Sequence, residues 1–232
     1  MRISVIIPTF NEEKNIAKLV KYLQEEGGEA LAHIIVADGG SEDKTAEMAR
    51  KVGAKVVISP KKGRAAQMNY GASFATGQIL YFIHADARPP RGFINDIQSA
   101  IREGYQSGCY RFRFDSDKTL LKLNNYLTRL NILTARGGDQ TLFLTRQLFD
   151  ELYGFDEYYV IMEEYDLLRR LWRKNRSAFK IIPKEVCVSA RKYDTNSWAR
   201  VQVANLVAMT LFRLGAEPAR IAATYKKMLH YQ

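Results

Sequence analysis

The sequence predicts an α/β fold in which a mainly parallel β-sheet is flanked by helices. Short runs rich in Val and Ile alternate with longer segments of helical periodicity through the first half of the chain. These apolar runs lack strict polar alternation, as expected for strands that are buried on both faces. Four successive β-α repeats favour right-handed crossovers and a ligand crevice at the carboxyl ends of the strands.

The first half is expected to contain four strands and three helices. The strands are predicted at residues 3–7, 33–37, 55–58 and 78–83. The helices are predicted at residues 13–26, 42–52 and 64–75. Asn11 and Ser41 precede the first two helices and are residue types that favour the N-cap position.

The second half is less regular and continues without a linker or a repeat. Strands are predicted at residues 108–114, 140–144, 179–182 and 186–189. Helices are predicted at residues 119–134, 166–174, 197–214 and 218–229. We therefore expect one domain over residues 1–232, with a helical C-terminal appendage.

Composition indicates which class of protein this is and which kinds of partner it can bind. The 232 residues are 47% hydrophobic and 26% charged, which is typical of a globular chain and excludes disorder. The net charge of +10 favours an anionic partner such as a phosphate ligand, a nucleic acid or a membrane surface. The two cysteines, Cys109 and Cys187, indicate a reducing compartment, and we expect a cytoplasmic protein.

The apolar stretches are too short for membrane insertion. The run at residues 3–8 is shorter than the apolar core of a signal peptide, and no small-residue cleavage site follows it. The longest uncharged stretch near the C-terminus, Val201 to Phe212, has 12 residues, fewer than a membrane span needs. We expect no transmembrane segment, while peripheral membrane contact stays open.

Polar residues follow three of the predicted strands. Residues 8–12 (Pro-Thr-Phe-Asn-Glu) follow the first strand, residues 38–41 (Asp-Gly-Gly-Ser) the second, and residues 84–86 (His-Ala-Asp) the fourth. The carboxyl ends of parallel strands meet at one edge of a sheet, so these segments are expected to share one rim.

Asp38 and three nearby bases are candidates for binding a nucleotide. Asp38 is placed to accept hydrogen bonds from a base or a ribose, although an ordinary β-α turn explains the same residues. Lys61, Lys62 and Arg64 precede or open a helix, where the dipole disfavours cations, so a negative group is expected nearby. A diphosphate bound by Arg64 would supply that charge, and a solvated loop is the alternative for the lysines.

Acidic residues at two further places have both a chemical and a structural interpretation. Asp86 could hold Mg²⁺ or Mn²⁺, since one or two carboxylates suffice when substrate phosphates share the ion, or it could cap a helix. Glu163, Glu164 and Asp166 open a helix, where the dipole and i,i+4 ion pairs favour acids without any catalytic role. Arg191 is either a second cationic clamp or a solvated edge residue.

In this order, the motifs resemble those of the family 2 glycosyltransferases, which have the GT-A fold. Residues 4–12 are similar to the family's opening strand and nucleotide loop, and residues 38–45 to its second motif. Gly63-Arg64 with residues 69–72 resembles the third motif. His84-x-Asp86 lies at the place of Asp-x-Asp, and residues 163–167 lie at that of Glu-Asp-x-Asp-Leu.

A narrower resemblance involves residues 84–86, 138–140 (Gly-Asp-Gln) and 189–191 (Ser-Ala-Arg). These are similar to a bacterial subgroup known as arsenosugar-biosynthesis or selenodomain-associated glycosyltransferases. No Gln-x-x-Arg-Trp motif follows, unlike in processive polysaccharide synthases, which favours a single sugar transfer.

The resemblance implies transfer of a sugar from a nucleotide diphosphate donor, expected to be UDP-linked, to a hydroxyl acceptor with inversion. Glu164 is implied as the general base and Asp86 as the ligand of a divalent metal, Mg²⁺ or Mn²⁺. The residues assigned to the donor are Pro8, Thr9, Asn11, Glu12, Asp38, Arg64 and Asp86. The residues assigned to the acceptor or phosphate side are Gly138, Asp139, Gln140 and Arg191.

The same resemblance divides the chain into functional parts. Residues 1–116 are expected to bind the nucleotide sugar, residues 117–195 to hold the acceptor and the catalytic groups, and residues 196–232 to form the helical appendage. The appendage is expected to pack on the catalytic domain or on a second subunit, so a homodimer is a possible assembly.

Three residues depart from the family pattern. Gly39 replaces the second acid of Asp-Asp-Gly-Ser, and Glu164 stands where the base is usually Asp. His84 replaces the first acid of Asp-x-Asp, which leaves Asp86 as the one clear metal ligand and makes weak or dispensable metal binding possible.

Two other classes of protein compete with this interpretation. A nucleotidyltransferase would bind a nucleotide sugar at the same rim, but its Gly-rich pyrophosphate loop is absent and Pro8 stands in its place. A nucleic-acid-binding module would explain the net charge but neither Asp86 nor the acids at 163–166. We therefore expect no nucleic-acid partner.

Overall fold

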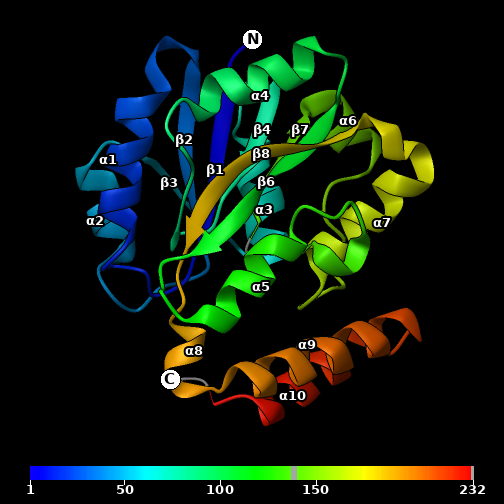
Figure 1. The fold of residues 1–232 in the computed structure, drawn as a ribbon. Coiled ribbons are helices and arrows are strands. Elements are labelled where there is room, and N and C mark those ends of the chain that lie inside the picture. The colour runs from blue at the N-terminus through cyan, green and yellow to red at the C-terminus, as the bar shows by residue number, and fades with distance from the viewer. Residues whose placement is uncertain (137–139, 231–232) are drawn as a thin grey trace.

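The computed structural model describes residues 1–136 and 140–230. Its eight strands are β1 (Ile3–Thr9), β2 (Leu31–Asp38), β3 (Lys55–Ile58), β4 (Ile79–Phe82), β5 (Ala87–Arg88), β6 (Ser107–Phe114), β7 (Leu142–Thr145) and β8 (Phe179–Val188). They form one sheet in the order β3-β2-β1-β4-β7-β6-β8-β5, with helices packed around it (Figure 1).

The α-helices are α1 (Ile16–Gly27), α2 (Thr45–Lys51), α3 (Arg64–Ser73), α4 (Phe93–Arg102), α5 (Thr119–Leu127), α6 (Arg146–Glu151), α7 (Glu163–Asn175), α8 (Lys192–Thr195), α9 (Trp198–Arg213) and α10 (Pro218–Met228). Three short 3₁₀ turns accompany them: η1 (Gly28–Ala30), η2 (Leu133–Ala135) and η3 (Arg176–Ala178).

The sheet is mainly parallel, as predicted. Strand β1 pairs in parallel with both β2 and β4, β2 pairs in parallel with β3, and β6 pairs in parallel with β8. Strand β7 is antiparallel to both of its neighbours, and the short edge strand β5 is antiparallel to β8. The carboxyl ends of β1, β2 and β4 therefore meet at one rim.

Both faces of β1 are buried. Ile3, Val5 and Ile7 belong to a core cluster that includes apolar residues of α1 and α4, whereas Ile6 packs with α3 and α7 on the opposite face. Because side chains alternate across a strand, this division confirms that the apolar run is buried on both sides.

The two C-terminal helices lie side by side next to α5, apart from the helices that cover the sheet (Figure 1). Asn196 ties the start of this pair to its end, since its side chain donates to the His230 carbonyl and accepts from the His230 N–H, both at 2.9 Å. Among the described residues, no helix is long and apolar enough to cross a bilayer.

Several boundaries differ from the sequence prediction. Helix α5 ends at Leu127, and Arg136 donates to the carbonyls of Thr128 and Leu130 in the segment that follows. The two predicted strands at 179–182 and 186–189 form one strand, β8. Helix α4 follows Pro89-Pro90, where the structural alternative for Asp86 placed a helix, but Gly92 and not Asp86 lies at its N-cap. Helices α6 and α8 and strand β5 were not expected.

The predicted N-caps were wrong. Helices α1 and α2 begin after Asn15 and Lys44, and neither residue makes a side-chain capping bond. Asn11 and Ser41 instead hydrogen bond to each other's loops at the rim.

Candidate active site

The loops after β1 and β2 hydrogen bond directly to each other. The N–H of Asn11 donates to the Ser41 hydroxyl at 2.9 Å, and the Asn11 side chain accepts from the N–H of Glu42 at 2.9 Å. Asn11 has a φ of 55°, a left-handed conformation that Asn tolerates better than most residues. Glu12 adds a further bond from its N–H to the Thr45 hydroxyl at 2.7 Å.

Asp38 holds the turn that follows β2. One carboxylate oxygen accepts from the N–H groups of Gly40 and Ser41 at 2.9 and 2.8 Å. The other accepts from the hydroxyls of Ser41 at 2.5 Å and Thr9 at 3.3 Å. The turn role considered for Asp38 is thus present, and its role toward a nucleotide stays a prediction.

Gln67, which the sequence did not single out, fixes the ends of both strands. Its buried amide donates to the carbonyls of Thr9 at 2.7 Å and Ala37 at 2.8 Å. The only signal in the sequence is a polar residue among the apolar residues of α3, and nothing in that pattern names its partners.

Buried Glu164 pairs with the partly buried His84. His84 Nε2 lies 3.3 Å from Glu164 Oε1, and both residues line a cavity of about 10 Å³, the size of one water, together with Pro8. Burial opposes ionisation of both groups, but their mutual contact raises the pKa of His84, and Arg64 and His84 lower the pKa of Glu164. Arg64 and His84 therefore favour the ionised form of Glu164.

Glu163 lies on the same helical turn in a different environment. It is completely buried, and Arg64 Nε lies 2.6 Å from its Oε1, although neither oxygen has a hydrogen bond of good geometry from the described residues. Burial and the neighbouring charge of Glu164 raise the pKa of Glu163. A negative group was expected near the bases at residues 61–64. Glu163 supplies one beside Arg64, and Glu157 supplies another, 2.7 Å from Lys61.

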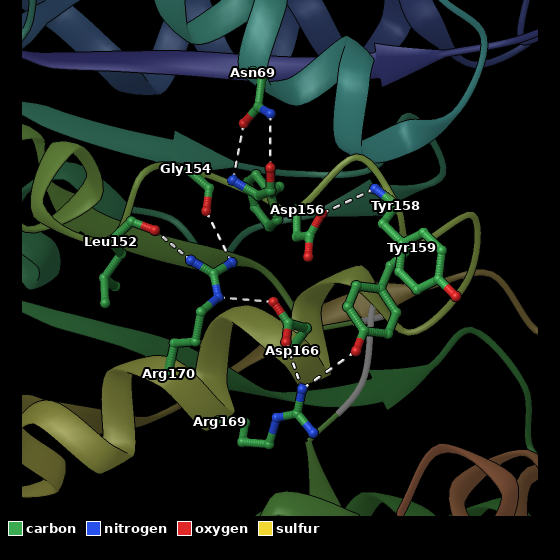
Figure 2. Close-up of polar contacts among 10 residues, drawn as sticks. Asn69, Leu152, Gly154, Asp156, Tyr158, Tyr159, Asp166, Arg169 and Arg170 are labelled. Carbon is green, nitrogen blue, oxygen red and sulfur yellow. Dashed lines mark hydrogen bonds and ion pairs between the residues drawn. The ribbon is translucent and has the colours of Figure 1, made fainter. Parts of the chain in front are cut away.

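Asp166 has the structural role considered for the acids of this helix. Its oxygens accept from Arg169 at 2.8 Å and from Arg170 at 2.7 Å, three and four residues later (Figure 2). Arg170 also donates to the carbonyls of Leu152 and Gly154, so Asp166 orients a residue that holds the loop before α7.

Asn69 holds that loop from the opposite side. Its side chain donates to the Phe155 carbonyl at 2.8 Å and accepts from the Phe155 N–H at 2.9 Å (Figure 2). Asn69, which belongs to the segment that resembles the family's third motif, thus positions the chain that leads to Glu164.

Arg191 connects three loops of the rim. Its Nη2 lies 2.7 Å from Glu12 Oε1 and 3.2 Å from Asp86 Oδ2. Arg191 is therefore not a purely solvated edge residue, since its partners include two carboxylates of the protein. The cluster brings the loop after β8 against the loops after β1 and β4.

The donor set at the rim fits a shared metal ion rather than a closed metal site. Among the described residues, no three His, Cys, Asp or Glu side chains gather as a cage. The Asp86 side chain is 26% exposed, and a single accessible carboxylate is the kind of ligand that Mg²⁺ uses when substrate phosphates supply other oxygens.

The oxygen and the NH₂ group of the Gln140 side chain both hydrogen bond within the core. Its oxygen accepts from the Cys109 thiol at 3.5 Å and its NH₂ donates to the Ala135 carbonyl at 3.3 Å. Gly138 and Asp139 lie outside the described residues.

Phe10, also missed, has a ring that is 52% exposed between Thr9 and Asn11. An exposed aromatic residue within a polar loop is the signal that could have identified it.

Residues 4–153 match the family model for glycosyl transferase family 2. The chain belongs to this family. It is 41% identical over 113 residues to the 4,4'-diaponeurosporenoate glycosyltransferase of Staphylococcus haemolyticus, a match that covers 45% of this chain and 30% of that protein. It is 30% identical over 96 residues to the glucosyl-3-phosphoglycerate synthase of Mycolicibacterium smegmatis, covering 38% and 32%. These matches span about a third of each relative's length.

Solved structures of similar proteins establish that this chain has the GT-A fold. Glucosyl-3-phosphoglycerate synthase from Mycobacterium tuberculosis, in complex with Mn²⁺, UDP-glucose and glycerol 3-phosphate, has a TM-score of 0.65 at 22% identity. That alignment covers 93% of this chain and 80% of the other. S. aureus TarS in complex with UDP-GlcNAc has a TM-score of 0.67 at 17% identity, covering 98% and 71%.

Proposed function

We propose that this glycosyltransferase moves a sugar from a UDP-linked donor to a hydroxyl acceptor and inverts the anomeric carbon. The observation that carries the proposal is the buried carboxylate of Glu164 beside His84 and Arg64, on the rim that also holds Asp86 and Arg191. The UDP-sugars bound in the two structural neighbours support the choice of donor.

In the proposed reaction, the acceptor hydroxyl oxygen attacks the anomeric carbon from the face opposite the diphosphate. The bond from that carbon to the phosphate oxygen breaks, UDP leaves, and Glu164 takes the hydroxyl proton as general base. The transition state resembles an oxocarbenium ion, as in glycoside hydrolysis. Arg64 and Arg191 stabilise the negative charge that develops on the leaving diphosphate.

The donor side is assigned to the loops after β1 and β2. Thr9, Asn11, Glu12 and Asp38 contact the nucleotide in this proposal. Hydrogen bonds between the loops after β1 and β2, including that of Thr9 to Asp38, hold both loops in place before it arrives. Pro8 lies beneath them, buried in β1. The exposed ring of Phe10 offers a face on which a base can stack.

Asp86 would hold a divalent metal ion at the diphosphate. When bound, Mg²⁺ or Mn²⁺ supplies positive charge that stabilises the leaving group. Arg191 already brings a cation to the same carboxylate, which supports a site where metal assists binding without being essential.

Finer assignments from the sequence stay predictions. They are the arsenosugar or selenodomain-associated subgroup, the division at residues 116 and 195, the acceptor-side roles of Gly138, Asp139, Gln140 and Arg191, a cytoplasmic location and a homodimer. Membership of family 2 speaks against the nucleotidyltransferase and nucleic-acid-binding alternatives.

The test is thermal unfolding with UDP, ADP or GDP, each with and without Mn²⁺. A ligand that binds the folded state at about 100 times its Kd stabilises it by about 2.7 kcal/mol. We expect UDP to raise Tm most, Mn²⁺ to enlarge the shift, and Asp86→Ala to remove that enlargement. No shift with any nucleotide would overturn the proposal. A native protein whose UDP shift is the same with and without Mn²⁺, and is matched by Asp86→Ala, would remove the metal from it.

A further inference from the structure

A cavity of about 740 Å³ lies between the catalytic part of the chain and the C-terminal helices. Its wall includes Arg64 and Glu164 on one side and residues of α9 and α10 on the other. We infer that this cavity binds the acceptor, and that the acceptor is an apolar molecule that presents its hydroxyl group to Glu164. The inference rests on the proposed function, because it takes Glu164 as the base.

Helix α9 is fixed at both ends and forms the roof of this cavity between them. Near its start, Trp198 Nε1 donates to Asn124 of α5 at 3.1 Å. Near its end, the Phe212 ring packs 5.7 Å from that of Tyr159. The middle of the helix contributes Gln202, Asn205, Leu206, Ala208 and Met209 to the cavity wall. These two contacts hold α9 in place, so the cavity beneath it is not a gap left by loose packing.

The wall is mainly apolar, and part of it contacts solvent. Five apolar side chains line the cavity while 42 to 67% exposed: Leu127, Leu130, Ile132, Val160 and Leu206. A polar acceptor would leave these side chains in water, whereas an apolar one would cover them. Each buried methylene of such a ligand should tighten binding about fourfold.

The charges of the wall exclude a cationic acceptor. Among the residues that the structure describes, four basic residues line the cavity together with one carboxylate, that of Glu164. The basic residues are Arg64, Arg136, Lys192 and Lys226. Arg136 donates to the carbonyls of Thr128 and Leu130, and Arg64 lies beside Glu163 as well as in the cavity wall. A neutral or anionic apolar molecule fits this distribution.

Binding is tested with the fluorescent apolar probe N-phenyl-1-naphthylamine, displaced by ω-hydroxy fatty acids from hydroxyhexanoate to hydroxydodecanoate. We expect the affinity to rise about fourfold per methylene until the chain fills the cavity. Glycerol and a hydroxyalkyl trimethylammonium ion of equal length should displace little. Equal displacement by glycerol or by the cation would overturn the inference.

The matched variants are Leu206→Asp and Leu214→Asp. Leu206 lines the cavity, while Leu214 follows the same helix, is 78% exposed and lies outside the cavity wall. Leu206→Asp should weaken binding of the long hydroxy acid by about tenfold or more, and Leu214→Asp should leave it unchanged. Ala222→Trp, which fills the cavity from α10, should weaken it as well. Equal affinities in all four proteins would contradict the assignment.

UDP binding, measured by calorimetry in the same proteins, separates the two proposals. UDP affinity unchanged in Leu206→Asp, with hydroxy acid binding lost, supports both. If UDP binds but the hydroxy acids do not, the apolar acceptor is wrong and the proposed function stands. If no nucleotide binds, the proposed function fails and the acceptor role fails with it.

A second arm identifies the source of the acceptor. Flotation with phosphatidylglycerol vesicles, lost in Leu206→Asp but not in Leu214→Asp, would indicate an acceptor taken from a membrane. Displacement by the monomeric hydroxy acid without flotation would indicate a free molecule. Failure of both arms would overturn the inference.

Discussion

Along the donor side of the rim, backbone amides and short polar side chains of neighbouring loops hydrogen bond to one another, with Asp38 and Asn11 at the centre. Across the site, the wall of the large cavity consists mainly of apolar side chains, several of them in contact with solvent. The first region is arranged before any ligand arrives, while the second has room for a ligand to complete it. One side of the site is thus completed by its own hydrogen bonds, and the other leaves apolar surface for a ligand to cover.

Glu164 lies where these two regions meet, so its removal should have the largest effect. Glu164→Gln keeps the size of the side chain but cannot accept the acceptor proton. Sugar transfer should fall by about 10²- to 10⁴-fold while UDP binding stays near that of the native protein. Steady-state transfer rates and calorimetry with UDP measure the two effects.

Glu163→Gln is the control, because Glu163 lies one residue away on the same turn and contacts Arg64 instead of His84. It should retain most of the transfer rate. Equal losses in both variants would point to a shared electrostatic role, and full activity in Glu164→Gln would remove Glu164 as the base.

Asp38→Ala tests whether the donor side is truly fixed. The change leaves the N–H groups of Gly40 and Ser41 without their acceptor and should lower the free energy of unfolding by about 2 to 4 kcal/mol. Leu206→Ala, in the exposed part of the other wall, should change it by about 0.5 kcal/mol or less. Urea unfolding of both variants gives the comparison, and similar losses would show that the two regions do not differ.

The pH dependence of stability should reveal the protonation of Glu163. Because its folded pKa is raised, the folded state keeps a proton that the unfolded state has released. Glu163 therefore makes stability fall as pH rises from near 4.5 to its raised pKa, by about 1.4 kcal/mol per pKa unit. Urea unfolding from pH 4 to 8 should show this decline in the native protein and less of it in Glu163→Gln. Parallel curves would contradict the raised pKa.

The sequence predicted the parallel strands well, because their apolar runs are bounded by turn residues and because burial on both faces leaves a distinct pattern. It also predicted that the segments after β1, β2 and β4 share a rim. The N-cap assignments failed because Asn11 and Ser41 have partners on another loop, about 30 residues away, which no local pattern encodes.

The cavity could not be predicted from the sequence for a related reason. Its walls come from α5, the segment before α7, α9 and α10, and each of these looks like an ordinary amphipathic or apolar segment alone. The pairing of His84 with Glu164 joins residues 80 positions apart and likewise needed the fold. Asp166 is the opposite case, since its partners lie three and four residues later and the helical spacing indicated them.

The contact between Arg191 and Glu12 joins residues 179 positions apart. During synthesis, Arg191 therefore emerges from the ribosome only after most of the chain has been made. Only then can it contact the loop after β1. Contacts of such long sequence separation form late, because the entropy of closing the intervening chain must be overcome first. A nascent chain that ends before Arg191 can form the hydrogen bonds between the loops after β1 and β2. It lacks the ion pair that joins these loops to the second half of the chain.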